Sequence, residues 1–230
     1  MPTLSIIIPV YNEHLTLDKV LRGVMATLPD LHELIVVDDG SSDGTSGVLC
    51  EWAAHPVVKV VIHEANRGKG AAIRSGLAAA TGELIAIQDA DLEYDPADLP
   101  RLVQPLLDDE ADVVYGSRFA GNGKPPPGYW VSRMANRVLT RLSNLLTGLQ
   151  VTDMECGYKV FRSRLLDDVE LVENRFGFEP EITAKLARQK PRVVEVPIRY
   201  RGRTYRQGKK IRAGDAVRAV YAIVKYRVKK

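Results

Sequence analysis

Short apolar runs alternate with segments of helical character along the first half of the chain, and this alternation constrains the fold more than any other feature of the sequence. The runs lie at residues 4–9, 34–37, 57–62, 84–87 and 112–115. Helices are expected between them, at 15–28, after Asp43, at 67–80 and at 96–107. Strands and helices in alternation with short connections predict an α/β fold, with a mostly parallel central sheet flanked by helices.

The second half of the chain departs from this rhythm. Residues 117–130 are rich in glycine and proline and are expected to form a mobile loop. Helices are expected at 131–147 and 178–189, and an edge strand at 193–200, where Pro197 is tolerated. A last helix at 214–228 places one set of apolar residues on one face, Val217, Val220, Tyr221, Val224 and Val228. We expect a single domain over residues 1–230, because a chain of this length can bury one core.

Composition excludes several classes of protein. No stretch approaches the ~18 apolar residues that span a bilayer, and the first residues lack the positive charge of a signal peptide. The two cysteines, Cys50 and Cys156, can build neither a disulfide scaffold nor a metal site, so we expect a protein of the reducing cytoplasm. The four histidines have no metal-ligand spacing and are expected at the surface, at positions 14, 32, 55 and 63.

Positive charge is concentrated at the carboxyl end. Residues 192–230 contain thirteen Lys or Arg and two acids, a net charge of +11, whereas the whole chain carries +3. The segment 199–212 alone has seven basic residues and no acid. A basic tail on an acidic body suggests an anionic partner, such as phosphates or anionic lipid, and a merely solvated basic surface is an equal alternative. The acidic body argues against nucleic acid as that partner.

Acidic residues follow three of the predicted strands. They lie in the segments 9–13 (PVYNE), 38–43 (DDGSSD) and 89–93 (DADLE). Ligands of open α/β sheets bind at the carboxyl ends of the strands, so these carboxylates are expected to share one rim. Unpaired carboxylates repel one another, and Mg²⁺ or Mn²⁺ bound to their oxygens would relieve the repulsion and could hold a diphosphate. Asp43 has an alternative role as a helix cap.

The segment 66–70 (NRGKG) has the composition of a phosphate-binding loop but not its pattern, because a glycine rather than Ser or Thr follows Lys69. Two interpretations remain open for it. The glycines either open a helix beside a bound nucleotide or serve packing alone.

These segments, in this order, resemble the inverting family 2 glycosyltransferases, which have the GT-A fold. Residues 116–119 (GSRF), 153–158 (DMECGY) and 203–209 further resemble the dolichol-phosphate mannosyltransferase branch, which transfers a sugar from a nucleotide to a polyprenyl phosphate. The resemblance covers nearly the whole chain. It implies that residues 1–116 bind the nucleotide sugar and that 117–230 bind the acceptor, with a basic loop and a final amphipathic helix.

The resemblance also implies residue roles. The nucleotide sugar would be bound by Pro9, Tyr11, Glu13, Val37, Asp39, Asp89, Ala90 and Asp91. The metal, Mg²⁺ or Mn²⁺, would be held by Asp91 and Glu93. The acceptor would be bound by Arg118, Ser132, Asn136, Arg203 and Lys209. The catalytic set would be Asp89, Asp91, Arg118, Arg203 and Lys209. Glu93 stands where the mannosyltransferases often have glutamine, and Gly128 and Gly177 stand where an arginine and a lysine are expected.

The expected reaction is a single displacement with inversion, from a donor of the GDP-mannose or UDP-glucose type to a polyprenyl or dolichyl phosphate. A phosphate acceptor is already anionic and needs little help from a base, whereas a hydroxyl acceptor would need one, with Asp153 and Glu155 as the candidates. The first alternative is therefore the same fold acting on a sugar, a small molecule or a protein hydroxyl. A sugar-1-phosphate nucleotidyltransferase and a nucleic-acid-binding module are weaker alternatives. Because the chain ends at Lys230, we expect membrane contact to be peripheral, on the cytoplasmic face, or made through a membrane partner protein.

Overall fold

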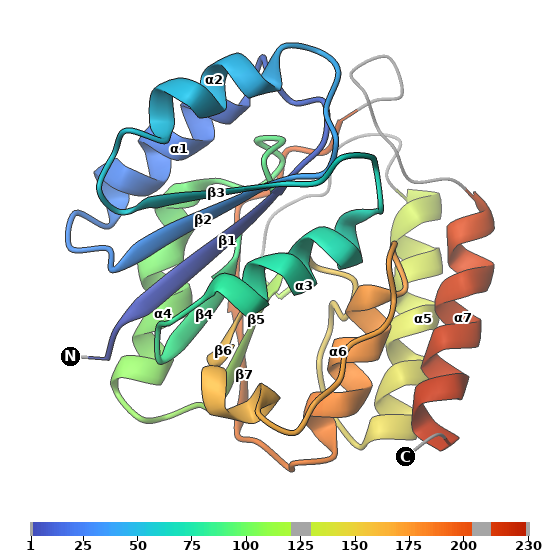
Figure 1. Ribbon diagram of the computed structural model, residues 1–230. Helices are drawn as coiled ribbons and strands as arrows, with labels where there is room; N and C mark the ends of the chain where they lie inside the picture. Colours follow the sequence, from blue (N-terminus) through green and yellow to red (C-terminus); the bar gives the residue numbers. More distant parts are fainter. Residues whose placement is uncertain (1, 121–129, 204–212, 229–230) are drawn as a thin grey trace.

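A seven-stranded sheet forms the centre of the molecule and helices cover both of its faces (Figure 1). The computed structural model describes residues 2–120, 130–203 and 213–228, without the side chains of 130–132, 213–217 and 228. The strands are β1 (Leu4–Val10), β2 (Glu33–Asp38), β3 (Val58–Ile62), β4 (Leu84–Ile87), β5 (Val113–Ser117), β6 (Lys159–Arg162) and β7 (Val193–Pro197). Their order in the sheet is β3-β2-β1-β4-β6-β5-β7.

The expected α/β fold with a mostly parallel sheet is confirmed. β1, β2, β3 and β4 pair in parallel, as do β5 and β7, and only β6 runs antiparallel to its neighbours β4 and β5. No strand was expected at β6, which is only four residues long and begins with a lysine that is fully buried. The predicted edge strand is β7, although it ends at Pro197 rather than at residue 200.

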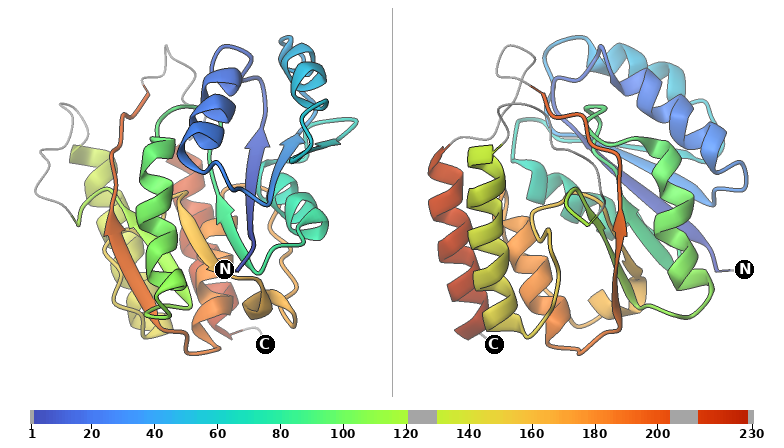
Figure 2. Two further views of the ribbon diagram at one scale, coloured as in Figure 1. Left: turned by 90° about the vertical axis from the view of Figure 1, so that its left-hand side faces the viewer. Right: turned by 180° about the vertical axis from the view of Figure 1, so that it is seen from behind.

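Two apolar layers hold the helices on the sheet. The helices are α1 (Leu17–Thr27), α2 (Thr45–Trp52), α3 (Lys69–Ala79), α4 (Leu99–Leu107), α5 (Trp130–Thr147), α6 (Phe178–Ala187) and α7 (Ala213–Val228). The residues of β1 show the division, since Ile6 and Ile8 pack with α1, α2 and α4 while Ile7 packs with α3. The second layer also holds α5, α6 and α7, which Figure 2 shows gathered at one end of the molecule. Alternate burial on two faces explains why the strands are almost wholly apolar.

Helix boundaries follow the predictions within a few residues. The segment 96–107 differs, because it opens with a 3-10 turn at Pro96–Asp98 before α4 begins. Another 3-10 turn, Ser163–Leu166, follows β6. The loop expected at 117–130 falls mostly outside the described residues, as does the part of the basic segment beyond residue 203. Among the described helices, none combines the length and the apolar character needed to cross a bilayer.

Helix α7 turns a different face inward from the one that the periodicity suggested. Its buried residues are Ala219, Ala222, Ile223 and Tyr226, which face α5 and α6. Val220, Tyr221 and Val224 are exposed. The buried face combines two alanines with Ile223 and Tyr226, and it is this mixture of small and large side chains that packs against α5 and α6.

Candidate active site

Four carboxylates gather where β1 and β4 end, and we call this set the acidic rim: Glu13, Asp89, Asp91 and Glu93. β1 and β4 are parallel neighbours in the sheet, so the segments that follow them emerge side by side. Burial, together with the charges of Asp89 and Glu93, raises the pKa of Asp91 to about 7. The acids that follow β1 and β4 therefore share one rim, as expected, whereas Asp39, after β2, is used in internal contacts.

Arg203 lies across the acidic rim. Its guanidinium donates to both carboxylate oxygens of Glu13, at 3.1 and 2.8 Å, and to the backbone oxygen of Asp91. Its backbone N–H donates to Glu93 Oε1 at 2.6 Å. Arg203 thus neutralises part of the rim from the far end of the chain. Lys209, its expected partner, lies outside the described residues.

Tyr200 joins the acidic rim to a second cluster, around Arg118. Its hydroxyl donates to Glu93 Oε2 at 2.9 Å, so both carboxylate oxygens of Glu93 contact the segment 198–203. Its ring lies 5.4 Å from the ring of Tyr94 and 5.2 Å from the guanidinium carbon of Arg118. Neither Tyr200 nor Tyr94 was among the expected site residues.

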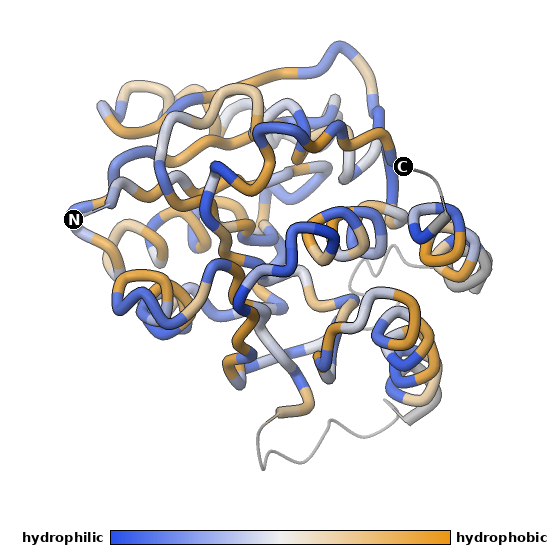
Figure 3. The backbone as a smooth tube through the Cα atoms, turned by 90° about the horizontal axis from the view of Figure 1, so that it is seen from below, coloured by the Kyte–Doolittle hydropathy of each residue, from blue (hydrophilic) through white to orange (hydrophobic). Residues whose placement is uncertain are grey.

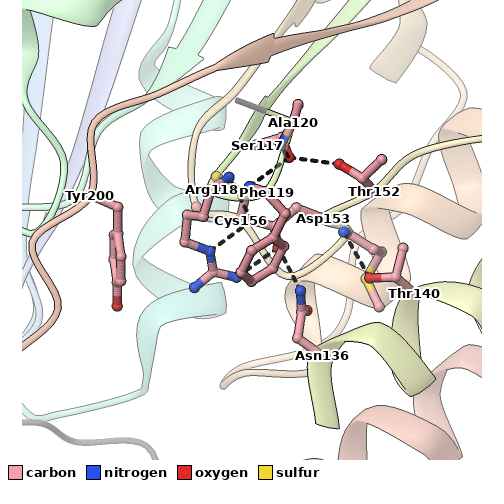
Figure 4. A network of polar contacts seen from close by, with 12 residues as sticks. Ser117, Arg118, Phe119, Ala120, Asn136, Thr140, Thr152, Asp153, Cys156 and Tyr200 are labelled. Carbon is pink, nitrogen blue, oxygen red and sulfur yellow. Dashed lines mark hydrogen bonds and ion pairs between the residues drawn. The ribbon is translucent and has the colours of Figure 1, made fainter. Parts of the chain in front are cut away.

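Arg118 is held in place by a buried carboxylate. Its Nε and Nη2 donate to the two oxygens of Asp153, both at 2.7 Å, and its backbone N–H donates to Asp153 at 3.0 Å (Figure 4). Asn136 of α5 adds a fourth donor at 2.9 Å. Because the bonds use the Nε–Nη2 edge of the guanidinium, its Nη1 edge is turned away from Asp153. The structure therefore brings the predicted acceptor residues Arg118 and Asn136 together. Ser132 lies on α5, with its side chain outside the described set.

Asp153 is poorly suited to act as a base. Its carboxylate is fully buried and accepts all four of the hydrogen bonds just described. Glu155 differs, because its Oε1 is buried and has no hydrogen-bond partner. Burial and the nearby charge of Glu179 raise the pKa of Glu155 to about 8. Of the two candidates named from the sequence, only Glu155 keeps an oxygen that can take a proton.

Lys69 connects the two halves of the chain. Its ammonium lies 2.9 Å from Asp89 Oδ1 and 3.1 Å from Glu179 Oε1, at the start of α6. Burial alone would lower the pKa of Lys69, but the two carboxylates outweigh burial and raise it. Asp89 itself fits closely under Gly157, where an added Cβ would lie 2.4 Å from Asp89 Oδ2.

The glycines beside Lys69 serve packing. A Cβ at Gly68 or at Gly70 would lie 2.3 Å from a backbone oxygen of residues 173–174, and Gly68 has a φ of +101°. The carboxylate of Asp39 accepts the backbone N–H groups of Arg67 and Gly68, at 2.9 and 2.7 Å. Of the two interpretations left open for the segment 66–70, the geometry favours packing.

Asp39 is committed to internal contacts and is almost fully buried. Besides the two backbone groups it accepts a bond from His63 Nδ1 at 2.7 Å, and His63 Nε2 lies 2.9 Å from Ser75 Oγ. The expectation that His63 lies at the surface is therefore wrong, because a carboxylate and a hydroxyl satisfy both of its ring nitrogens inside the protein. The N-cap of α2 is Gly44 rather than Asp43, although Asp43, one residue earlier, accepts the N–H of Thr45 at 3.1 Å.

The remaining residues expected to bind the nucleotide lie close to the acidic rim. Pro9 and Val37 are paired in register at the ends of β1 and β2. The side chains of Val37 and Ala90 are buried in the core, so their backbone is what they can offer to a ligand. Tyr11 and Pro9 are partly exposed.

The acidic rim has the chemistry that a hard divalent cation requires. Within residues 2–120, 130–203 and 213–228, no three His, Cys, Asp or Glu side chains are already grouped to hold a metal ion. Asp91 and Glu93 nevertheless supply carboxylate oxygens two residues apart, and the pKa of Asp91 is raised by burial and by the charges of Asp89 and Glu93, both of which a bound cation would offset. These two residues therefore fit Mg²⁺ or Mn²⁺. Tyr200 and Arg203 already donate hydrogen bonds to Glu93 and would compete with the cation for its oxygens.

Comparison with known proteins agrees with this geometry. Residues 5–170 match the family model described as glycosyl transferase family 2. The chain belongs to this family. It is 32% identical over 210 residues to the undecaprenyl-phosphate 4-deoxy-4-formamido-L-arabinose transferase of Edwardsiella ictaluri, and 32% identical over 211 residues to that of Sodalis glossinidius. In both cases 89% of this chain is covered, but only 62% of the relative, so the chain spans less than two thirds of their length.

Solved structures of a glucosyl-3-phosphoglycerate synthase show the same fold. The glucosyl-3-phosphoglycerate synthase of Mycobacterium tuberculosis, in complex with UDP, superimposes with a TM-score of 0.77 at 22% identity, over 98% of this chain and 80% of that one. The same enzyme with Mn²⁺, UDP and phosphoglyceric acid gives a TM-score of 0.74 at 21% identity, over 99% and 79%. The expected GT-A fold is thereby confirmed.

Proposed function

We propose that this family 2 glycosyltransferase is a metal-dependent, inverting enzyme that transfers a hexose from a nucleotide sugar to a polyprenyl phosphate. The observation that carries the proposal is the arrangement of charge. A carboxylate rim suited to a cation lies beside a fixed arginine, and Tyr200 contacts both. The curated relatives, named for transfer to undecaprenyl phosphate, support this choice of acceptor.

The donor would bind over the acidic rim. Asp91 and Glu93 would hold Mg²⁺ or Mn²⁺, which neutralises charge on the departing nucleoside diphosphate when it is bound. Arg203, now on Glu13, has the charge and the position to contact that diphosphate, and Lys209 remains a second expected contact. A donor of the GDP-mannose or UDP-glucose type stays the expectation. The complexes of the glucosyl-3-phosphoglycerate synthase with Mn²⁺ and UDP support such a metal-assisted donor site.

The acceptor would bind at Arg118. The Nη1 edge of Arg118 is available for a phosphate oxygen, and Asp153 fixes the guanidinium in advance. Asp153 accepts four hydrogen bonds and is badly placed to remove a proton, which favours a nucleophile that is already an anion. A polyprenyl phosphate meets that condition. Attack of its oxygen on the anomeric carbon, with departure of the nucleoside diphosphate, is one displacement and inverts the configuration.

A hydroxyl acceptor is the second candidate, and Glu155 is the observation that favours it. Its unpartnered oxygen and its pKa of about 8 would suit a general base. On that alternative the enzyme transfers sugar to a small molecule, a sugar or a protein without any lipid.

A lipid acceptor also determines where the enzyme works. We propose that it acts at the cytoplasmic face of a membrane as a peripheral protein, held there directly or through a membrane partner protein. The basic carboxyl-terminal segment supports this proposal, because anionic lipid attracts clustered Lys and Arg residues.

The test of the donor site is a transfer assay with a panel of labelled sugar nucleotides, polyprenyl phosphate and Mn²⁺ or Mg²⁺. Label should enter the organic phase with one donor and stop when EDTA removes the metal. Asp91→Asn should abolish transfer, whereas Asp108→Asn, on the exposed end of α4, should not change it. Full activity in EDTA, or in Asp91→Asn, would refute the proposed metal site.

A further inference from the structure

A glutamate of β7 holds the turn that carries Asp153. Glu195 lies between two valines of this short strand, and Figure 3 shows apolar and polar residues mixed along the backbone in this way. Its Oε1 accepts the backbone N–H groups of Thr152 and Asp153, at 2.7 and 3.1 Å, and the Thr152 hydroxyl at 3.3 Å. Burial raises the pKa of Glu195, so the carboxylate is kept partly out of water for these contacts.

The turn needs such contacts because it belongs to an irregular segment. Residues 148–158 lie between α5 and β6 and form neither helix nor strand, so their backbone groups must find partners elsewhere. Thr140 of α5 accepts the N–H of Met154 at 3.1 Å, and Lys159 donates to the backbone oxygen of Met154 at 3.0 Å. Glu195 serves the two N–H groups just before these, which makes it the contact that fixes the first part of the turn.

The direction of Arg118 depends on this turn. Arg118 follows β5, and both its backbone and its guanidinium donate to Asp153 (Figure 4), so the guanidinium follows the position of that carboxylate. Asp153 is fixed at its side chain by Asn136 and at its backbone by Glu195. Because β5 and β7 pair in register, with Tyr115 opposite Glu195, the same two strands carry the arginine and the acid that holds its partner.

We propose that Glu195 is a positioning residue for sugar transfer, which fixes the turn at residues 152–153 so that Asp153 presents the guanidinium of Arg118 to the acceptor phosphate. The proposal rests on the acceptor site proposed above. Glu195 contacts the turn rather than the guanidinium, so it acts on transfer through geometry. A misplacement of about 1 Å in such a group can cost on the order of 100-fold in rate, so a small shift of the turn is measurable.

Two conservative substitutions separate the reach of Glu195 from its charge. Glu195→Asp keeps the charge but withdraws the carboxylate from the turn by one methylene. It should raise the KM for polyprenyl phosphate on the order of tenfold, as expected for the loss of a hydrogen bond to a charged group, and change the KM for the donor little. Glu195→Gln keeps an oxygen at the same reach and should stay within about twofold of the unaltered enzyme in both constants.

Glu33 provides the matched control. It is also a glutamate of the sheet whose Oε1 accepts the backbone N–H and the hydroxyl of one threonine, Thr81. It begins β2, at the end of the sheet opposite to the acidic rim. Glu33→Asp therefore disturbs the same kind of contact away from the site. It should lower the free energy of unfolding and leave the KM for polyprenyl phosphate unchanged.

A second measurement reports on the guanidinium itself and needs no substrate. The Nε–H of Arg118 donates to Asp153, whose side chain is 0% exposed, and its proton should exchange slowly with water. Nuclear magnetic resonance of the ¹⁵N-labelled chain follows this proton, which is assigned by its absence in Arg118→Lys. Glu195→Asp should accelerate the exchange on the order of tenfold, because the carboxylate that protects it is no longer fixed. Glu195→Gln and Glu33→Asp should leave it unchanged.

Three results would overturn the proposal. They are unchanged exchange of the Arg118 Nε–H in Glu195→Asp, an acceptor KM that Glu33→Asp raises as much as Glu195→Asp does, and a loss in Glu195→Gln equal to that in Glu195→Asp. The proposed function fails separately. If the unaltered enzyme transfers no sugar to polyprenyl phosphate, the acceptor assignment is wrong, whereas the exchange measurement still decides whether Glu195 positions Arg118.

Discussion

The pair between Arg118 and Asp153 offers the sharpest test of how the site is built. In the variant Asp153→Asn, the guanidinium of Arg118 keeps its position in the chain but loses its counter-charge. Asp153 is 0% exposed and Arg118 is 14% exposed. Removal of one partner from a buried ion pair typically costs about 3–5 kcal/mol, because the other charge is left without compensation. We therefore expect Asp153→Asn to reduce the free energy of unfolding by that amount.

An exposed pair provides the matched control. Asp109 accepts from the guanidinium groups of Arg162 and Arg192, at 2.7 and 2.8 Å, close to the distances at Asp153. Its side chain is 74% exposed, so water replaces whatever the substitution removes. Asp109→Asn should change the free energy of unfolding far less than Asp153→Asn does, because water screens and replaces an exposed pair. The two substitutions share their chemistry and differ in burial.

Urea denaturation followed by circular dichroism measures both variants. If Asp153→Asn is too unstable to purify, the double variant Arg118→Met/Asp153→Leu removes both charges and should recover much of the stability. It should also remain inactive, since no guanidinium is left to bind phosphate. A loss at Asp153→Asn no larger than that at Asp109→Asn would refute the argument that burial makes this pair strong.

Three further predictions concern the glycines, a buried acid and the acidic rim. Gly68→Ala should destabilise the protein more than Gly44→Ala. Both glycines have φ near +100°, but only a Cβ at Gly68 would meet a backbone oxygen. Thermal unfolding of the two variants measures the difference. Hydrogen bonds from Lys59, Ser5 and Thr81 overcome the burial of Glu33 and lower its pKa from 4.5 to about 2. Glu33 should therefore contribute about 3 kcal/mol to the free energy of unfolding above pH 4.5, and this contribution should disappear as the pH falls toward 2. A Glu33→Gln variant should lack this part of the pH dependence of unfolding. Glu93→Gln should retain the contacts to Tyr200 and to the Arg203 N–H but bind Mn²⁺ more weakly, with a titration of Mn²⁺ by electron paramagnetic resonance as the measurement.

Much of the fold was predictable because burial on two faces leaves a simple pattern in the sequence. Strands such as β1 are continuous apolar runs, and α1 repeats apolar residues at helical spacing. β6 gave no such signal, because it begins with a charged residue, Lys159. Its ammonium group can be buried because it donates hydrogen bonds to the backbone oxygens of Met154 and Cys156. The inward face of α7 was misjudged because more than one set of its apolar residues has helical spacing, and only packing against α5 and α6 selects the set that contains Ile223 and Tyr226.

The residues of the candidate site that lie at the ends of strands were predictable. Glu13, Asp89, Asp91 and Glu93 could be placed on one rim, because each follows a strand of a parallel sheet. Contacts between distant segments were not predictable. Nothing local shows that Tyr200 reaches Glu93, that Arg203 reaches Glu13, or that Asp39 and His63 satisfy each other inside the protein. Such pairs depend on the topology of the whole chain.

The central claim is that the acceptor is a phosphate, which needs no base. The most direct measurement compares polyprenyl phosphate with the corresponding polyprenyl alcohol as acceptors for the same labelled donor, by counting label in the organic phase. The account predicts transfer to the phosphate alone, and a Glu155→Gln variant that keeps transferring. Transfer to the alcohol at a comparable rate, lost in Glu155→Gln, would contradict the account and assign Glu155 as the base for a hydroxyl acceptor.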